Sequence, residues 1–198
     1  MTMLPDITAV AAAIKEAARG EALSRFQKLQ DHEIKEKTPG DLVTVADLET
    51  ERALNSALSG LLPGSIMVGE EAVAENPGLL PARAGDAACW IIDPIDGTIN
   101  YAHGVPLFAT MVALVVGGEV VGGWIYDSVH DLMAMAEKGA GAYLDGQRVS
   151  LPPAPPLNRL SGCLHLAGYD RELAATAARN FEDVGPLLVL HCAGLEYQ

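Results

Sequence analysis

The stretch CWIIDPIDGTINYAHG, residues 89–104, runs a strand-like apolar segment directly into two aspartates that flank a proline. Asp, Pro and Gly are the usual residues of tight turns, and a residue that precedes proline is biased away from helix. A turn alone is therefore one explanation for Asp93 and Asp96. The other explanation is a functional site, because a stiff proline turn would aim both carboxylates at one point. The backbone carbonyl of Ile95 would join them there.

Carboxylates also follow other strand-like segments of the chain. If those strand ends meet, several negative charges share one site, which raises their pKa values unless cations are bound. Oxygen ligands without His or Cys favour Mg²⁺ over zinc or copper. The sequence therefore predicts a Mg²⁺ site. The carboxylates come in three pairs: Asp41 and Asp47, Glu70 and Glu71, and Asp93 and Asp96.

Gly97 and Thr98 follow these aspartates and are expected to open a helix, whose free N–H groups bind phosphate. Two cations can clamp a phosphate ester, activate a water molecule and stabilise the leaving alkoxide. We expect Glu70 and Thr98 to orient that water, and Asp47 to polarise Thr98. No Ser or Cys lies in a nucleophile motif such as Gly-x-Ser-x-Gly. A covalent enzyme intermediate is therefore not expected.

The composition limits the classes of partner. Hydrophobic residues make up 49% of the chain, which is enough for a substantial core, and the formal net charge is −13. Such a charge repels nucleic acids and anionic membranes, so neither is expected as a partner. The three cysteines are far apart and suggest neither disulfides nor a zinc site. No basic leader precedes the first apolar segment, so the expected location is the cytoplasm.

The hydrophobic pattern predicts an α+β fold. Apolar residues recur at helical spacing near both ends of the first third of the chain, and Gly-rich turns separate β-rich runs after residue 105. We expect an N-terminal α+β domain at 1–150 that carries the metal site, and the start of a smaller C-terminal α/β domain at 151–198. The expected elements are helices at 7–18 and 46–58, short strands at 42–45 and 65–71, an antiparallel meander over 106–150, a proline-rich linker at 151–160, and a strand, helix and strand at 162–167, 171–181 and 187–191.

Three segments resemble the signatures of the inositol monophosphatase family of Mg²⁺-dependent, lithium-sensitive sugar phosphatases. They are DLVTVAD (41–47), VGEEA (68–72) and WIIDPIDGTINYAHGVP (90–106), and the resemblance extends over about residues 35–150. It implies a layered αβαβα fold and a homodimer. It also implies metal ligands at Glu70, Asp93, Ile95 (through its carbonyl) and Asp96, and phosphate binding by Gly97 and Thr98.

The sequence departs from this family in one respect. The family's later Trp-Asp-x-Ala-Ala-Gly motif supplies another metal aspartate, yet neither Trp90 nor Trp124 is followed by Asp. The final HCAGLEYQ, residues 191–198, resembles the stretch shortly before that motif. The resemblance therefore implies that the C-terminal part of the family's fold is absent from this chain.

The expected reaction is Mg²⁺-dependent hydrolysis of a small polyol or sugar phosphate similar to inositol monophosphate. Histidinol phosphate, fructose 1,6-bisphosphate and 3'-phosphoadenosine nucleotides are alternative substrates within the superfamily. A non-catalytic dimeric regulatory or scaffold protein is the alternative from another class. The absent aspartate favours the scaffold, whereas the intact cluster opposes it, because a scaffold does not need so many adjacent carboxylates. That cluster contains Glu70, Asp93, Asp96 and Thr98.

Overall fold

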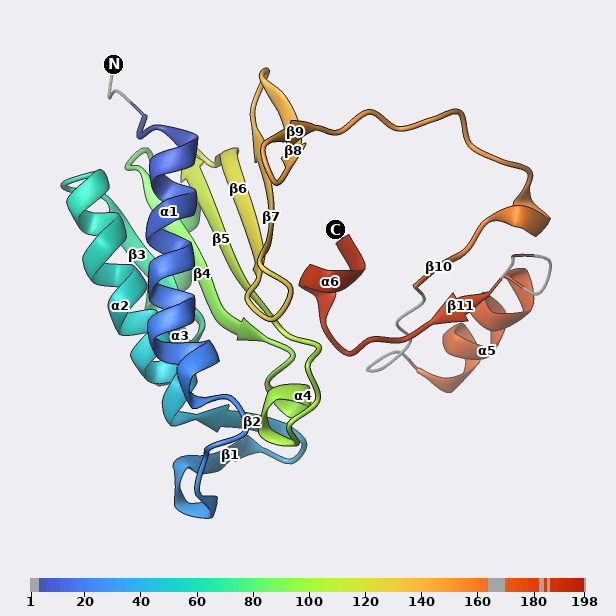
Figure 1. Cartoon of the computed structure of the whole chain (residues 1–198), viewed down its shortest axis with the longest axis horizontal. Coiled ribbons are helices and arrows are strands. Elements are labelled where there is room, and N and C mark those ends of the chain that lie inside the picture. Colours follow the sequence, from blue (N-terminus) through green and yellow to red (C-terminus); the bar gives the residue numbers. More distant parts are fainter. Residues whose placement is uncertain (1–3, 164–169, 182–183, 185, 198) are drawn as a thin grey trace. The chain divides into compact units, whose positions relative to one another are not determined.

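The computed structural model describes residues 4–163, 170–181, 184 and 186–197 (Figure 1). The chain divides into two compact units, Met1–Val149 with Cys192–Gln198, and Ser150–His191. The first boundary lies next to the one that the sequence predicts. The segment from Cys192 onward, however, was expected in the C-terminal part and instead packs with the first unit, for a reason described below. The two units are considered separately.

The first unit is built on a seven-stranded sheet with the order β3-β4-β5-β6-β7-β8-β9. β3 pairs parallel with β4, and every later pair in this sheet is antiparallel. The predicted meander is therefore confirmed, and with it the α+β class. The strands are β3 Ile66–Gly69, β4 Cys89–Asp96, β5 Ala109–Val116, β6 Glu119–Asp127, β7 Leu132–Glu137, β8 Gly141–Leu144 and β9 Gln147–Arg148.

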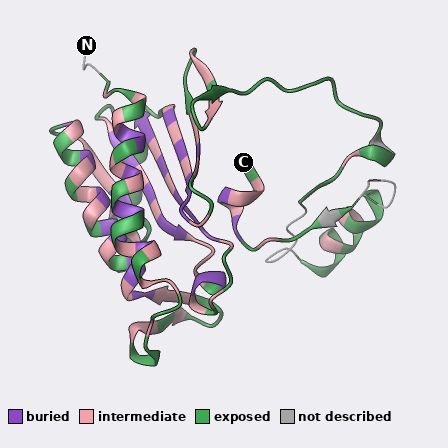
Figure 2. Cartoon of the chain, viewed as in Figure 1, coloured by how far each residue is buried: buried purple, intermediate pink, exposed green. Residues whose placement is uncertain are grey.

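Two helices cover one face of this sheet (Figure 1). α1 spans Ile7–Ala17 and α2 spans Val45–Leu61, close to the predicted ranges. Asp6 caps α1 by accepting the backbone N–H groups of Thr8 and Ala9. The buried residues line the helix faces that point to the sheet (Figure 2). This core includes Val10, Ile14, Leu54, Leu58, Trp90, Ile92, Val112, Leu114, Trp124 and Tyr126.

The opposite face of the sheet receives helix α6, Ala193–Tyr197, which contacts β5 and β6. Side chains alternate along a strand, so Ile125 points away from the face that Trp124 and Tyr126 share with α1 and α2. A Cβ on Gly194 would lie 2.8 Å from Ala109 Cβ and 3.1 Å from Ile125 Cγ2, so this glycine allows α6 to approach the sheet closely. This packing explains why the chain after Cys192 belongs to the first unit.

Shorter elements complete the first unit. β1 and β2 form a separate antiparallel hairpin, whose turn contains Gly40 at a φ of 84°. A 3-10 helix spans Pro77–Ala84 and, with α3, contacts β3 and β4 at one edge of the large sheet. The remaining bounds are β1 Ile34–Thr38, β2 Asp41–Thr44, α3 Glu70–Glu75 and α4 Thr98–Ala102.

The second unit contains a two-stranded parallel sheet of β10, Gly162–Cys163, and β11, Leu187–Leu188. Helix α5, Arg171–Asn180, lies between them in the sequence and confirms the predicted helix. The predicted strand at 187–191 is longer than β11, since residues 189–191 are not in a strand. Residues 164–167 of the other predicted strand lie outside the described residues. Within the described part of the chain, no helix is long and apolar enough to cross a membrane.

The packing of α2 against the sheet predicts the stability of variants. Leu54 is fully buried in α2, whereas Leu48 on the same helix is 38% exposed. We expect Leu54→Ala to lower the free energy of unfolding by about 2–5 kcal/mol, because it removes buried methyl groups and leaves a cavity. Leu48→Ala should lower it by less than about 1 kcal/mol. Urea denaturation followed by tryptophan fluorescence measures both, and equal losses would contradict this account of the core.

Candidate active site

The end of β4 contains a β-bulge instead of the tight turn that the sequence suggests. Asp93 pairs with Met111 and Asp96 pairs with Ala109, so β4 contains one more residue than β5 over this interval. Proline is tolerated at a bulge because it has no N–H to donate to the ladder. The carbonyl of Pro94 accepts the Thr110 hydroxyl at 2.8 Å, which holds the irregular segment in place.

The bulge changes which residues share a face of the sheet. Residues three apart in a regular strand point to opposite faces, and the extra residue restores Asp93 and Asp96 to the same side. Ile95 is 1% exposed and packs with Tyr101 and Phe108. Its carbonyl, a predicted metal ligand, accepts the Thr98 hydroxyl at 2.9 Å.

Gly97 directs the chain from β4 into α4. It adopts a φ of 89° and a ψ of 35°, a left-handed conformation that favours glycine. α4 then begins at Thr98, so the predicted helix start is confirmed. The Thr98 hydroxyl lies 3.3 Å from Asp47 Oδ1, and the structure thus brings together the pair that the sequence predicts.

Asp47 is fully buried in the first turn of α2. Its Oδ2 accepts the backbone N–H of Thr44 at 2.8 Å and the Thr44 hydroxyl at 2.6 Å, which completes the cap of this helix. Burial raises the pKa of Asp47 to about 6, against the opposing effect of the hydrogen bonds from Thr44. Asp47 therefore combines a structural cap with the contact to Thr98.

Glu70 and Glu71 begin α3, and both carboxylates bind the ammonium group of Lys37. The distances from Lys37 Nζ are 2.9 Å to Glu70 Oε1 and 3.1 Å to Glu71 Oε1. Burial would lower the pKa of Lys37, but these hydrogen bonds outweigh it and raise that pKa above its ordinary value. Burial raises the pKa of Glu71 to about 7 despite Lys37. Asp41 lies farther from the ammonium, at 3.7 Å. The ammonium group of Lys37 thus lies among three carboxylates.

Asp93 is the least satisfied carboxylate of the group. Its Oδ1 is buried and has no hydrogen-bond partner among the described residues. Burial raises the pKa of Asp93, and the charges of Glu70 and Asp96 raise it further. The like charges of Glu70 and Asp96 thus act on the buried carboxylate of Asp93.

Asp96 receives contacts that sequence reasoning missed. Its Oδ2 accepts the backbone N–H of Gly194 at 2.5 Å and lies 3.1 Å from Cys192 Sγ. The start of α6, nearly one hundred positions later in the chain, therefore binds this carboxylate directly. Only the small residues Ala193 and Gly194 in the final segment hint at so close an approach, and no local pattern identifies Asp96 as their partner.

The donor set fits a hard divalent cation. Asp93 offers a buried oxygen without a partner, and the Lys37 ammonium shows that positive charge is stabilised beside Glu70. In their present conformations, the His, Cys, Asp and Glu side chains of the described residues form no group of three that could hold a metal ion. Glu70 and Asp96 are instead bound by Lys37 and by Gly194, so these two side chains would exchange those contacts for the cation.

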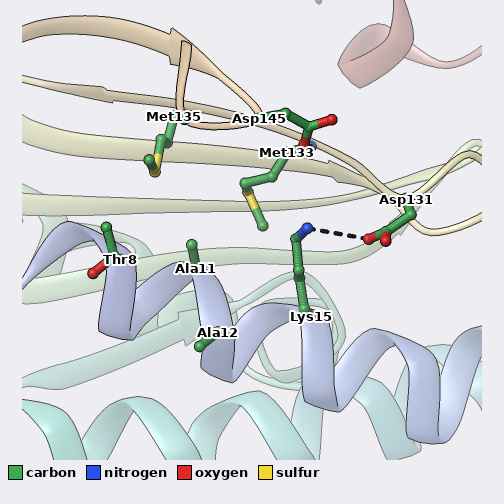
Figure 3. Close-up of a pocket in the computed structure, with 9 residues that line it drawn as sticks. Thr8, Ala11, Ala12, Lys15, Asp131, Met133, Met135 and Asp145 are labelled. Atoms are coloured by element: carbon green, nitrogen blue, oxygen red, sulfur yellow. Dashed lines mark hydrogen bonds and ion pairs between the residues drawn. The ribbon is translucent and has the colours of Figure 1, made fainter.

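A groove elsewhere in the first unit does not include these carboxylates. It has a volume of about 470 Å³ and lies between α1, the strand β7 and the turn that joins β8 to β9. Lys15 at its end is paired with Asp131 at 3.1 Å, and Met133 and Met135 face Ala11 and Ala12 across it (Figure 3). Since its cation is already neutralised, the groove lacks the chemistry of the β4 end, and the candidate site stays with the carboxylates.

Comparison with known proteins identifies the family of this chain. A sequence profile described as the inositol monophosphatase family matches residues 3–186, and so includes every residue of the candidate site except those at the start of α6. The chain belongs to the inositol monophosphatase family.

Individual members of the family are similar to this chain over about two thirds of its length. Pig inositol monophosphatase 1 is 35% identical over 134 residues, which cover 68% of this chain and 47% of that protein. A fructose-1,6-bisphosphatase/inositol-1-monophosphatase of Aquifex aeolicus is 36% identical over 141 residues, covering 71% of this chain and 51% of that protein. The chain thus spans about half the length of the curated relatives that it matches.

Solved structures show the same fold. The extragenic suppressor protein suhB of Bartonella henselae matches with a TM-score of 0.77 and 28% identity over 96% of this chain and 71% of that one. The Thermotoga maritima IMPase matches with a TM-score of 0.75 and 26% identity, over 96% of this chain and 69% of that one. The predicted fold and family are therefore both confirmed.

The raised pKa of Asp47 predicts a pH dependence of stability in the metal-free protein. The ordinary value is 3.8 and the folded value is about 6. Between them the folded protein keeps a proton that the unfolded chain loses, so the free energy of unfolding falls as pH rises, by about 1.4 kcal/mol per pH unit for this group. Asp47→Asn keeps an oxygen for the Thr44 cap but cannot ionise. We expect the stability of this variant, relative to the wild type, to rise by roughly 2 kcal/mol from pH 4 to pH 6.5.

Urea denaturation in EDTA at several pH values measures this difference. Comparing the two proteins cancels the titration of groups that do not interact with Asp47; the charge of Asp47 is only the smallest cause that raises the pKa values of Glu71 and Asp93, so these two groups contribute a smaller change. A difference in stability that stays constant between pH 4 and pH 6.5 would show that Asp47 is ionised throughout in the folded protein.

Proposed function

We propose that this protein hydrolyses a small phosphate monoester, with a water molecule as the nucleophile. The observation that carries the proposal is the convergence at the end of β4. There the bulge directs Asp93 and Asp96 to one side, next to Glu70, while Gly97 turns the chain so that the Thr98 hydroxyl reaches Asp47. Membership of the inositol monophosphatase family supports the same reaction class.

The protein's own groups would divide the work as follows. Glu70 and Thr98 orient the attacking water, and Glu70, as the more basic group, accepts its proton. The single hydroxyl hydrogen of Thr98 is shared between the Ile95 carbonyl at 2.9 Å and Asp47 Oδ1 at 3.3 Å, which leaves the oxygen lone pairs of Thr98 for the water. The backbone at Gly97 and Thr98, where α4 begins, hydrogen-bonds the phosphate oxygens. No side chain needs to form a covalent bond to phosphorus.

We infer that Mg²⁺ is the cofactor, since the available ligands are all oxygens. Glu70, Asp93, Asp96 and the Ile95 carbonyl would hold it. When bound, it supplies Lewis acidity that stabilises negative charge on the phosphate and on the leaving oxygen. It would also balance the charges that raise the pKa of Asp93.

The substrate that we propose is a phosphorylated polyol or sugar, with inositol monophosphate as the first compound to test. The similarity to the Aquifex aeolicus protein named as both fructose-1,6-bisphosphatase and inositol-1-monophosphatase favours fructose 1,6-bisphosphate as the second. Histidinol phosphate and 3'-phosphoadenosine nucleotides complete the panel. We also propose a cytoplasmic homodimer, in keeping with the resemblance.

A non-catalytic regulatory or scaffold role is the competing hypothesis. It would make the carboxylates purely structural, as the Asp47 cap and the bond from Gly194 to Asp96 are in part. The partnerless oxygen of Asp93 argues against it, because a structural carboxylate would be expected to have its hydrogen bonds satisfied. Binding of a divalent metal decides between the two.

Metal removal tests the proposal directly. We expect phosphate release from inositol monophosphate to stop in excess EDTA, to return with added Mg²⁺, and to be inhibited by millimolar lithium. The assay uses this chain and any longer natural protein that contains it, so that missing residues are not mistaken for missing chemistry. Undiminished turnover in EDTA by either protein would refute the Mg²⁺ mechanism.

Asp96→Asn provides the second test. The amide keeps an oxygen to accept the Gly194 N–H but removes the charge that would hold the cation, so we expect phosphatase activity to fall by at least about a thousandfold. Asp86→Asn is the matched control, because Asp86 is exposed in the loop before β4. Calorimetric titration with Mn²⁺ should show the same contrast in affinity. Near-normal activity of Asp96→Asn would indicate that the β4 segment is only a structural feature.

A further inference from the structure

Glu51 is a buried carboxylate on α2, four residues after Asp47, and it is 5% exposed. Its two oxygens accept the start of the neighbouring helix α3. Oε2 accepts the Glu71 N–H at 2.8 Å, and Oε1 accepts the Ala72 N–H at 3.1 Å. The first N–H groups of a helix have no partner within it, so Glu51 caps α3 from outside. A buried charge without such partners would be strongly unfavourable.

The same carboxylate also occupies the space beside Gly69. A Cβ built on Gly69 would lie 2.2 Å from Glu51 Cδ and within 2.5 Å of both its oxygens, closer than real contacts allow. The φ of Gly69 is −88°, an ordinary value for any residue. A side chain at position 69 would therefore displace the Glu51 carboxylate, whereas the backbone conformation there suits any residue.

Glu51 thus holds the chain on both sides of Glu70. It packs against Gly69 before it, and it binds the N–H groups of Glu71 and Ala72 after it. We propose that Glu51 is a positioning residue that fixes the backbone around Glu70 so that the Glu70 carboxylate stays beside Asp93. This role rests on the proposed function, in which Glu70 is a cation ligand.

Glu51→Gln is the informative substitution because it changes the hydrogen bonding with little change in shape. An amide has one oxygen and one NH₂ group, so one of the two backbone N–H groups would face another donor. Glu49→Gln is the matched control, since Glu49 lies on the same helix and pairs with Arg52 at the surface at 2.5 Å. We expect the Glu71 and Ala72 amide resonances to shift in Glu51→Gln and to stay in place in Glu49→Gln.

Calorimetric titration with Mn²⁺ alone then measures the effect on the site. We expect Glu51→Gln to weaken Mn²⁺ binding at least tenfold and Glu49→Gln to leave it within twofold. A double-mutant cycle separates positioning from general loss of stability. In a Glu70→Gln background, the further change Glu51→Gln should alter Mn²⁺ affinity by less than twofold, because the ligand that it positions is already lost. An undiminished tenfold effect in that background would overturn the positioning role.

The two proposals fail in different ways. If the wild-type chain does not bind Mn²⁺, the proposed metal-dependent function is wrong, and the role of Glu51 is wrong with it. If the wild type binds Mn²⁺ and Glu51→Gln binds it equally well, only the role of Glu51 is wrong. Should Glu51→Gln not fold, Gly69→Ala keeps the carboxylate but displaces it. The same tenfold loss is expected there, and unchanged Mn²⁺ affinity would overturn the proposal.

Discussion

The bulge in β4 between Asp93 and Asp96 is the constraint on which the rest of the site depends. It lets Ile95 remain in the core while both carboxylates point to the other side of the chain. Side chains alternate in a regular strand. With Ile95 buried, Asp96 would point to the opposite face, but Asp93 would point to the same side as Ile95. Pro94 suits the bulge because it has no N–H, and Thr110 secures its carbonyl. The positions of Gly97 and of α4 follow from where β4 ends.

Once the carboxylates are gathered, electrostatics determines what must surround them. The pKa of Asp93 is raised by burial and by the charges of Glu70 and Asp96, so the metal-free site is strained by like charges. Lys37 neutralises part of this charge by binding Glu70 and Glu71. A net charge of −13 for the chain offers little further relief at long range. Protonation of Asp93, which its raised pKa favours, and a bound cation both lower this energy, and the cation agrees with the oxygen ligands of the site and its proposed chemistry.

The sequence predicted the α+β class, the meander, the helix start at Thr98 and the gathering of Asp47, Glu70, Asp93 and Asp96, because each depends on local spacing or on a distinctive motif. It did not predict the bulge, since Asp-Pro and Gly are equally typical of a tight turn. Nor did it predict the bonds from Gly194 to Asp96 and from Glu51 to α3. Those contacts join segments that are distant in the sequence. In the sequence, a buried glutamate on an amphipathic helix, such as Glu51, looks the same as one that is exposed to solvent.

Backbone N–H groups at helix starts hold three of these carboxylates. Thr44 at the start of α2 donates to Asp47, α3 donates to Glu51, and Gly194 in the first turn of α6 donates to Asp96. Such N–H groups have no partners within their own helices, so each bond satisfies a donor while stabilising a negative charge. In the described structure, Asp93 Oδ1 receives no donor of this kind. The helices therefore fix the surrounding carboxylates in place and leave Asp93 as the group whose charge a ligand from outside the protein must balance.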